Sequence, residues 1–220
     1  PDATVDLMRR VLSLTPAQDD QDHIRLLVDN NPRVPSRIAA LIEGTGPSPL
    51  PTLVSMAQGL EAAGADFLAM PCNTAHHYHG QIAASISIPF LNLMELVVAE
   101  LAARHGGLRR IGLLASSVLP KIRLYEPYCE AAGLDLIYPR GGKQEALMAL
   151  IRAVKAARAD EAARRAFSEA ARDIGEQGAE VALVACTELS FVDSALTTAL
   201  PVVDAADVLA RAVVQRAMAA

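Results

Sequence analysis

One short pattern occurs twice in this chain, about half a chain apart. The copies are "ADFLAMPCNTAH", residues 65–76, and "AEVALVACTEL", residues 179–189. A glycine directly precedes each copy and completes a Gly-Ala-acid triplet. An apolar run, a cysteine and a small polar turn follow. Cys72 follows Gly64 by eight positions, and Cys186 follows Gly178 by the same eight.

The likeness extends beyond the cysteines. A proline opens a further apolar run after each copy, in "PFLNLME" from Pro89 and in "PVVDAAD" from Pro201. Asn92 and Asp204 occupy the same place in these runs, just ahead of a helical pattern. We therefore expect a duplicated strand–Cys–helix–strand–helix unit.

Strand-length apolar segments alternate with helical patterns along the whole chain. The apolar segments are continuous, which is typical of parallel strands covered on both faces; they span residues 23–30, 66–72, 88–93, 109–116, 134–139, 181–186 and 200–205. Helices are expected at residues 52–64, 93–106, 121–133, 144–159 and 160–178, several ending on a glycine in the C-cap region: Gly64, Gly106, Gly133 and Gly178. This alternation predicts an α/β fold with parallel sheets.

Charge and composition exclude several classes of partner. The formal net charge is −5 and aromatic residues make up 4% of the 220 residues, so neither a nucleic-acid footprint nor an anionic-membrane footprint is expected. Three cysteines without a Cys-x-x-Cys pair favour a reducing, cytoplasmic location over a disulfide framework. The chain begins at Pro1 without a methionine, and we expect further residues ahead of it.

Two of the cysteines stand where parallel sheets bind ligands. Cys72 and Cys186 fall at predicted strand ends ahead of helix starts, where backbone N–H groups attract anions and lower a thiol pKa. Asn73-Thr74 and Thr187 add side-chain donors beside them. Inverting a carbon centre needs a base on one face and an acid on the other, which two facing thiols supply. Cys129, within a helical pattern, is instead expected to be a buried structural residue.

These motifs resemble the aspartate/glutamate racemase superfamily, most closely its aspartate racemase branch. The resemblance rests on "DNNPRVPSR", "MPCNTAH", "IGLLAS", "AVKAARA" and "ACTEL" and covers essentially the whole chain. It implies two similar four-stranded parallel-sheet (flavodoxin/Rossmann-like) subdomains related by pseudo-two-fold symmetry, with the active site in the cleft between them. We place the first subdomain at residues 1–97 plus 206–220, its first strand missing before residue 1, and the second at residues 98–205. The resemblance also implies a homodimer, a small amino-acid substrate, and neither cofactor nor metal.

Carried over to this sequence, the resemblance assigns the following roles. Cys72 and Cys186 transfer protons. The substrate contacts are Asn73, Thr74 and Thr187 for the α-carboxylate, and Arg37 and Lys155 for the side-chain carboxylate, with Asn31 of the Asn-Asn-Pro segment beside them. His76 and Glu188 support the two turns. Glutamate racemases typically have Cys-Thr-His at the second cysteine, whereas this chain has Cys-Thr-Glu, which favours aspartate as substrate, with glutamate second.

Other interpretations stay open at this stage. Ser36 in "VPSR" and the turn "LLASSVLPK" depart from the aspartate racemase pattern and could change the accepted side chain. A maleate isomerase or hydantoin racemase would also keep both thiols, and a non-catalytic dicarboxylate- or amino-acid-binding protein could use the same cations. A zinc site at "CNTAHHYH" would leave the second cysteine copy unexplained, and His77 and His79 are instead expected to be surface residues.

Overall fold

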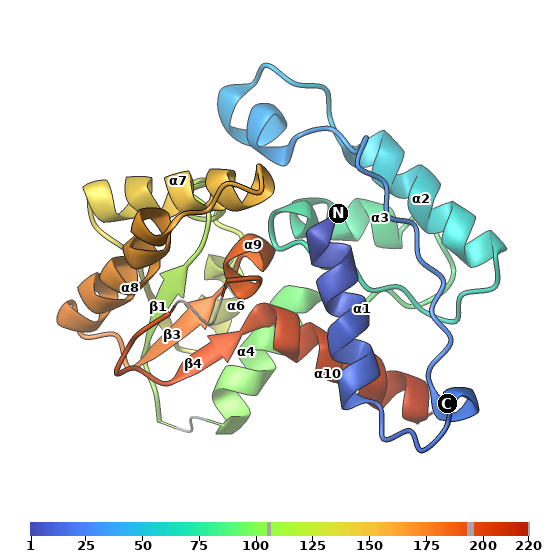
Figure 1. Cartoon of the computed structure of the whole chain (residues 1–220). Helices are drawn as coiled ribbons and strands as arrows, with labels where there is room; N and C mark the ends of the chain where they lie inside the picture. Colours follow the sequence, from blue (N-terminus) through green and yellow to red (C-terminus); the bar gives the residue numbers. More distant parts are fainter. Residues whose placement is uncertain (105–106, 193–195, 220) are drawn as a thin grey trace.

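The computed structural model describes residues 1–104, 107–192 and 196–219. Its centre is a parallel sheet with the strand order β2-β1-β3-β4 (Figure 1). The strands are β1 (Arg110–Leu114), β2 (Asp135–Ile137), β3 (Val181–Val184) and β4 (Val202–Asp204). In the register, Leu113 lies opposite Leu183 and Ala182 opposite Val202. The predicted α/β fold with a parallel sheet is confirmed.

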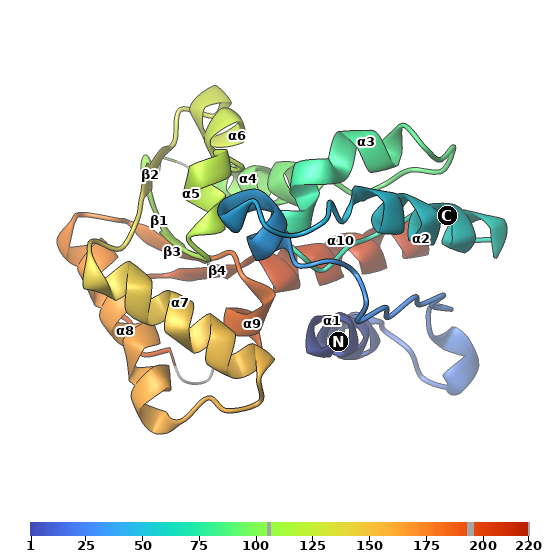
Figure 2. The same ribbon diagram turned by 90° about the horizontal axis from the view of Figure 1, so that it is seen from above.

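Helices cover both faces of this sheet, which explains its continuous apolar strands (Figures 1 and 2). One face packs against α7 (Gly142–Lys155) and α8 (Glu161–Glu176). The other packs against α4 (Leu93–Arg104), α5 (Val118–Ile122) and α6 (Glu126–Ala131). Neighbouring residues of β1 alternate between the two cores, with Leu113 in one and Leu114 in the other.

The first half of the chain is built mainly from helices and extended segments. Its helices are α1 (Asp2–Leu14), α2 (Leu50–Ala62) and α3 (His79–Ala83), with 3-10 helices η1 (Asp20–Asp22) and η3 (Thr74–Tyr78) and the π-helix η2 (Ala39–Glu43). Helix α9 (Thr187–Ser190) follows β3, and α10 (Ala205–Met218) ends the chain and packs against α1.

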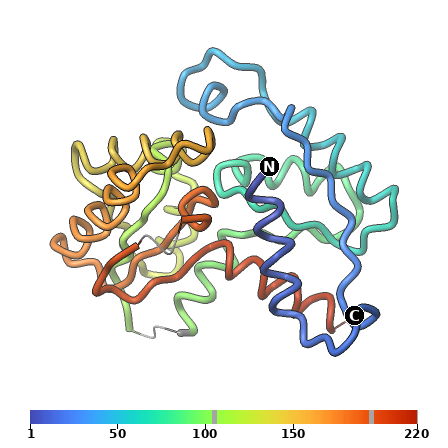
Figure 3. The backbone as a smooth tube through the Cα atoms, in the orientation of Figure 1, coloured from blue at the N-terminus to red at the C-terminus, as the bar shows by residue number. Residues whose placement is uncertain are grey.

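The predicted strands of the first half do not form a sheet. Among the described residues, one parallel bridge joins Leu68 to Phe90, and no ladder includes residues 23–30. Figure 3 follows the chain from α1 through this extended segment toward η2. Leu26 and Met70 line the same cavity of about 920 Å³. The two segments thus flank a cavity, whereas paired strands lie about 4.8 Å apart. In the first half, whose first strand is expected before residue 1, the described residues thus form this single bridge and no sheet of their own.

The helix expected at residues 121–133 is also wrong, because the chain forms two short helices there. Helix α5 ends at Ile122, and Arg123 takes a left-handed conformation with φ of 50°. Pro127 lies in the first turn of α6, where its missing N–H leaves no bond unmade. The break places Tyr125 between the two helices.

Local signals at the helix ends are confirmed. Gly64, Gly133 and Gly178 come just after α2, α6 and α8 with φ of 90°, 70° and 87°, the left-handed region that glycine enters without strain. Gly106 lies outside the described residues. Asn92 and Asp204, the matched positions of the repeat, accept hydrogen bonds from Met94 N and Ala206 N at 3.1 and 2.9 Å. The two halves of the repeat thus open their helices in the same way.

No helix in the described ranges is long and apolar enough to cross a membrane. The subdomain boundaries at residues 97 and 205 stay a prediction.

Candidate active site

The first cysteine turn follows an extended segment and leads into η3. Cys72 is half-buried and lines the large cavity. Its carbonyl oxygen accepts a hydrogen bond from His76 Nδ1 at 2.8 Å, which means that Nδ1 carries the proton. His76 is 4% exposed, and burial lowers its pKa to about 4, so the ring is neutral. His76 therefore ties η3 back to the carbonyl of Cys72.

Asn73 is also buried at this turn, and its amide is fixed from the other half of the chain. The hydroxyl of Tyr125 donates to Asn73 Oδ1 over 2.6 Å. Asn73 Nδ2 is buried and has no hydrogen-bond partner among the described residues. Thr74, the first residue of η3, is half-buried. Sequence reasoning missed Tyr125, because the bond joins residues 52 positions apart.

Two further histidines, His77 and His79, follow the turn and differ in their burial. His79 is half-buried, stacks on Phe90 with ring centroids 4.5 Å apart, and bonds to the carbonyl of Phe90, whereas His77 is exposed. The expectation that His79 is a surface residue is therefore wrong. In the described part of the chain, no group of three or more Cys, His, Asp and Glu side chains is placed to hold a metal ion.

The second cysteine turn follows β3 directly. Cys186 is the N-cap of α9 and is 8% exposed. Its Sγ donates to Glu188 Oε2 over 3.1 Å. Burial first, and then the charge of Glu188, raises the pKa of Cys186 well above its ordinary value, so this cysteine rests as a thiol. Thr187 begins α9 and lines the cavity that Cys72 also lines.

Lys155 interacts with the second cysteine turn and lies on the same cavity as the first. It ends α7 and forms an ion pair with Glu188. Burial lowers its pKa, but the charge and the hydrogen bond of Glu188 outweigh that and raise it, with smaller contributions from Cys186 and Cys72 in their thiolate forms. Lys155 and Cys72 line the same cavity, together with Glu188. Burial similarly opposes ionisation of Glu188, and Lys155 overcomes it and lowers the carboxyl pKa.

Arg37 and Asn31 lie on the same cavity, close to the start of η2. Arg37 is half-buried and donates from Nη1 to the Pro35 carbonyl over 3.2 Å. Asn31 Oδ1 accepts from Arg33 N at 2.9 Å, which shapes the loop. The cavity therefore joins Cys72, Lys155, Arg37, Asn31, Thr187 and Glu188 along its wall.

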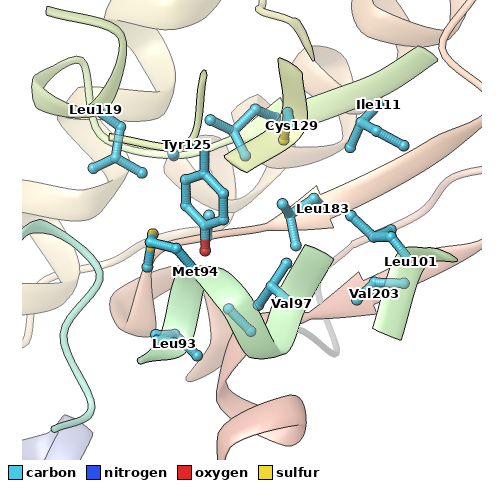
Figure 4. Packing of buried hydrophobic residues seen from close by; sticks show 14 of the residues in the cluster. Leu93, Met94, Val97, Leu101, Ile111, Leu119, Tyr125, Cys129, Leu183 and Val203 are labelled. Carbon is cyan, nitrogen blue, oxygen red and sulfur yellow. The ribbon is translucent and has the colours of Figure 1, made fainter. Parts of the chain in front are cut away.

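The third cysteine is separate from this site. Cys129 lies on α6, is 1% exposed and packs in the core between the sheet and α4 (Figure 4). Burial raises its pKa to about 12. It is a structural residue, as predicted.

The backbone carbonyl groups of the two cysteines are bonded by different side chains. Four residues after each cysteine, a side chain bonds the cysteine carbonyl: His76 at 2.8 Å in one turn and Ser190 at 3.3 Å in the other. The hydroxyl of Ser190 has one proton, and Oδ1 of buried Asp204, at 2.6 Å, is the nearer of its two acceptors. The repeat therefore keeps the position of the support and changes its chemistry.

Comparison with known proteins gives a consistent result. A sequence model of the family described as Asp/Glu/Hydantoin racemase matches residues 1–213. The broad specificity amino-acid racemase RacX of Bacillus subtilis (strain 168) is 27% identical over 167 residues, which is 76% of this chain and 71% of the relative.

Solved structures share the fold over nearly the whole chain. Picrophilus torridus aspartate racemase has a TM-score of 0.87 at 29% identity, covering 99% of this chain and 90% of the relative. Glutamate racemase isoform RacE1 from Bacillus anthracis has a TM-score of 0.67 at 12% identity, covering 99% and 78%. The second similarity concerns the fold alone.

Proposed function

The chain belongs to the Asp/Glu/Hydantoin racemase family, and on that premise we propose that it inverts the α-carbon of an acidic amino acid by proton transfer between Cys72 and Cys186. Aspartate is the first candidate substrate and glutamate the second. That the chain is a racemase follows from the family and from its likeness to an aspartate racemase. The thiol chemistry and the substrate are the proposal.

One observation carries it: Lys155, whose ion-pair partner Glu188 accepts the hydrogen bond of Cys186, lines the same cavity as Cys72. The two cysteines come from different copies of the repeat; Cys72 lines this cavity, and Cys186 directly precedes Thr187 and Glu188, which line it too. A small anionic substrate beside Lys155 would lie between the two sulfur atoms.

In one direction Cys72 would act as the base and Cys186 as the acid, a role that suits Cys186 because it rests as a thiol. Cys72 takes the α-proton, so an S–H bond forms as the C–H bond breaks and the electron pair moves into the α-carboxylate as an enolate-like carbanion. Cys186 then delivers its proton to the opposite face, which forms the new C–H bond and leaves Cys186 as thiolate. The reverse direction exchanges the two roles.

Donors around the turns would stabilise the carbanion. Asn73 Nδ2 is buried without a partner in the described structure and is suited to the α-carboxylate, with Thr74 and Thr187 beside the two cysteines. Such a donor can contribute about 3–4 kcal/mol to the transition state in a water-excluded site. Arg37 and Lys155 are the cations for a second carboxylate. Lys155 would then share its charge between the substrate and Glu188.

The experiment is proton NMR of L-aspartate in D₂O with the protein and no added cofactor, followed alongside chiral chromatography. Loss of the α-proton signal with D-aspartate appearing is the expected result. Cys72→Ser and Cys186→Ser should each abolish it, and Cys129→Ala, which removes a core thiol, should keep the rate. A fully active Cys72→Ser variant would overturn the two-thiol mechanism.

Substrate identity has its own test. Lys155→Met should raise KM for aspartate about tenfold while leaving KM for alanine nearly unchanged, since only aspartate has a second carboxylate. The panel includes glutamate, neutral and basic amino acids, maleate and a hydantoin, because the Bacillus subtilis relative is named a broad specificity racemase. Turnover of maleate or the hydantoin alone would favour a related isomerase. Binding of aspartate without any turnover would favour a binding protein.

A further inference from the structure

We infer that Tyr125 is a positioning residue for the Cys72 turn, because its hydroxyl orients the Asn73 amide so that the Asn73 N–H group is free to bind the substrate. This inference rests on the proposed racemase function. Nothing in the sequence motifs assigns a role to Tyr125.

The contact joins the two halves of the molecule. Tyr125 lies between α5 and α6, beside the sheet, whereas Asn73 follows directly on Cys72 in the first half. The hydroxyl of Tyr125 donates to Asn73 Oδ1 over 2.6 Å, and both side chains are buried, with exposures of 0% and 3%. Water therefore does not compete for this bond, and the bond ties the Cys72 turn to the second half.

The direction of this hydrogen bond determines which group of the Asn73 amide remains available to a ligand. A tyrosine hydroxyl has one proton, and it goes to Oδ1 of Asn73. The amide nitrogen lies on the other branch of the carboxamide, so Nδ2 points away from Tyr125. Nδ2 is buried and unpartnered among the described residues, an unfavourable state that a bound acceptor would relieve. Because Asn73 adjoins Cys72, the α-carboxylate of an amino acid is the fitting acceptor.

The tyrosine is itself held rigidly. Its ring packs among Met94, Leu119 and Cys129 in the core cluster (Figure 4). Burial, with the charges of Cys129 and Asp204 adding to it, raises the pKa of Tyr125 well above its ordinary value. The hydroxyl therefore keeps its proton throughout the working range of pH and remains a donor. With phenylalanine in its place the ring would still fill the core, but Oδ1 would lose its donor and the amide could turn over.

The test compares Tyr125→Phe with Tyr128→Phe. Tyr128 is the matched control, because it lies in the adjoining helix α6 and its hydroxyl accepts a bond from Asn92 Nδ2 at 3.1 Å instead of donating to Asn73. Tyr125→Phe should lower kcat/KM for α-proton exchange about tenfold or more, mostly through kcat, since the carboxylate contact strengthens as the carbanion forms. Tyr128→Phe should stay within about twofold of the wild type. Rates are compared below the lowest melting temperature of the three proteins.

A double-mutant cycle tests the contact without using activity. Tyr125→Phe, Asn73→Ala and the double variant are unfolded with urea, and a coupling of about threefold or more in the unfolding equilibrium constant is expected. The inference is overturned if Tyr125→Phe keeps the wild-type kcat/KM, if both tyrosine variants fall equally, or if the cycle is additive. A wild-type protein that exchanges no α-proton would overturn the racemase proposal and the positioning role, while a coupled cycle would still establish the contact.

Discussion

The thiol of Cys186 donates a hydrogen bond to Glu188 Oε2 over 3.1 Å, and the other carboxylate oxygen of Glu188 binds Lys155. A negative charge so close to sulfur opposes its ionisation, and burial opposes it further. Glu188 thus keeps the proton on Cys186, while Lys155 keeps Glu188 ionised.

Glu188→Gln is therefore expected to lower the pKa of Cys186, because it removes the charge and leaves the buried environment in place. Iodoacetamide labelling of Cys186 near pH 8, followed by mass spectrometry of its peptide, should be faster in the variant, by about tenfold for each pKa unit while the thiol form predominates. Glu145→Gln is the matched control, since Glu145 is exposed on the same helix as Lys155. An unchanged or slower rate in Glu188→Gln would contradict this account.

His76 is expected to stay neutral through the physiological range. Burial lowers its pKa to about 4, and its Nδ1 proton is held by the Cys72 carbonyl. The ring-proton NMR signal of His76, assigned by its loss in His76→Asn, should not shift between pH 6 and 9. A titration midpoint above about 6 would show that the ring takes up a proton within the fold.

Asp204 should make stability depend on pH in the acidic range. Burial raises its pKa to about 6 from the ordinary value of 3.8, although Ser190, Ala206 N and Arg10 oppose the shift. A raised folded-state pKa contributes stability below the unfolded pKa, and that contribution is lost as pH rises through about 6. The shift corresponds to about 3 kcal/mol.

Urea unfolding of Asp204→Asn against the wild type measures this contribution. Other carboxyl groups act in both proteins, so the difference in unfolding free energy isolates Asp204. The unfolding free energy of the wild type, relative to that of the variant, should decrease as the pH rises from 4 to 6.5. A difference that does not vary across this range would mean that Asp204 ionises at its ordinary pKa.

Gly112 is expected to be intolerant of a side chain, because β1 packs closely on α8 there. A Cβ atom at this position would come within 2.3 Å of Ile174 Cδ1. Gly112→Ala should lower the unfolding free energy by about 1–3 kcal/mol, and adding Ile174→Val, which removes that methyl group, should restore part of the loss. Thermal or urea unfolding of the variants and the wild type measures both the loss and its partial recovery.

Gly59→Ala provides the contrast. A Cβ atom there meets nothing within 4 Å, and α2 continues through the position. Alanine should therefore stabilise the helix by about 0.5–1 kcal/mol. Equal destabilisation by both alanines would rule out the packing explanation for Gly112.

Much of the secondary structure in the second half of the chain can be predicted from the sequence. The strands at residues 109–116, 134–139, 181–186 and 200–205 and the helices α7 and α8 follow from continuous apolar runs and from helical periodicity, which act over a few residues. The same holds for Cys72 and Cys186 at the ends of extended segments. Local patterns could not show that residues 23–30 and 66–72 do not pair as strands, because pairing depends on what lies between two segments.

By itself the sequence determined the α/β class, the paired cysteine turns and the glycines that end the helices, since each depends on neighbours along the chain. Only the tertiary structure decided which side chains meet. Lys155 and Glu188 are 33 positions apart, and Tyr125 and Asn73 are 52 apart. Their contacts depend on how α7 packs beside the second turn and how the break after α5 turns Tyr125 toward the first. Burial, which keeps Cys186 protonated and His76 neutral, likewise comes from packing over the whole molecule.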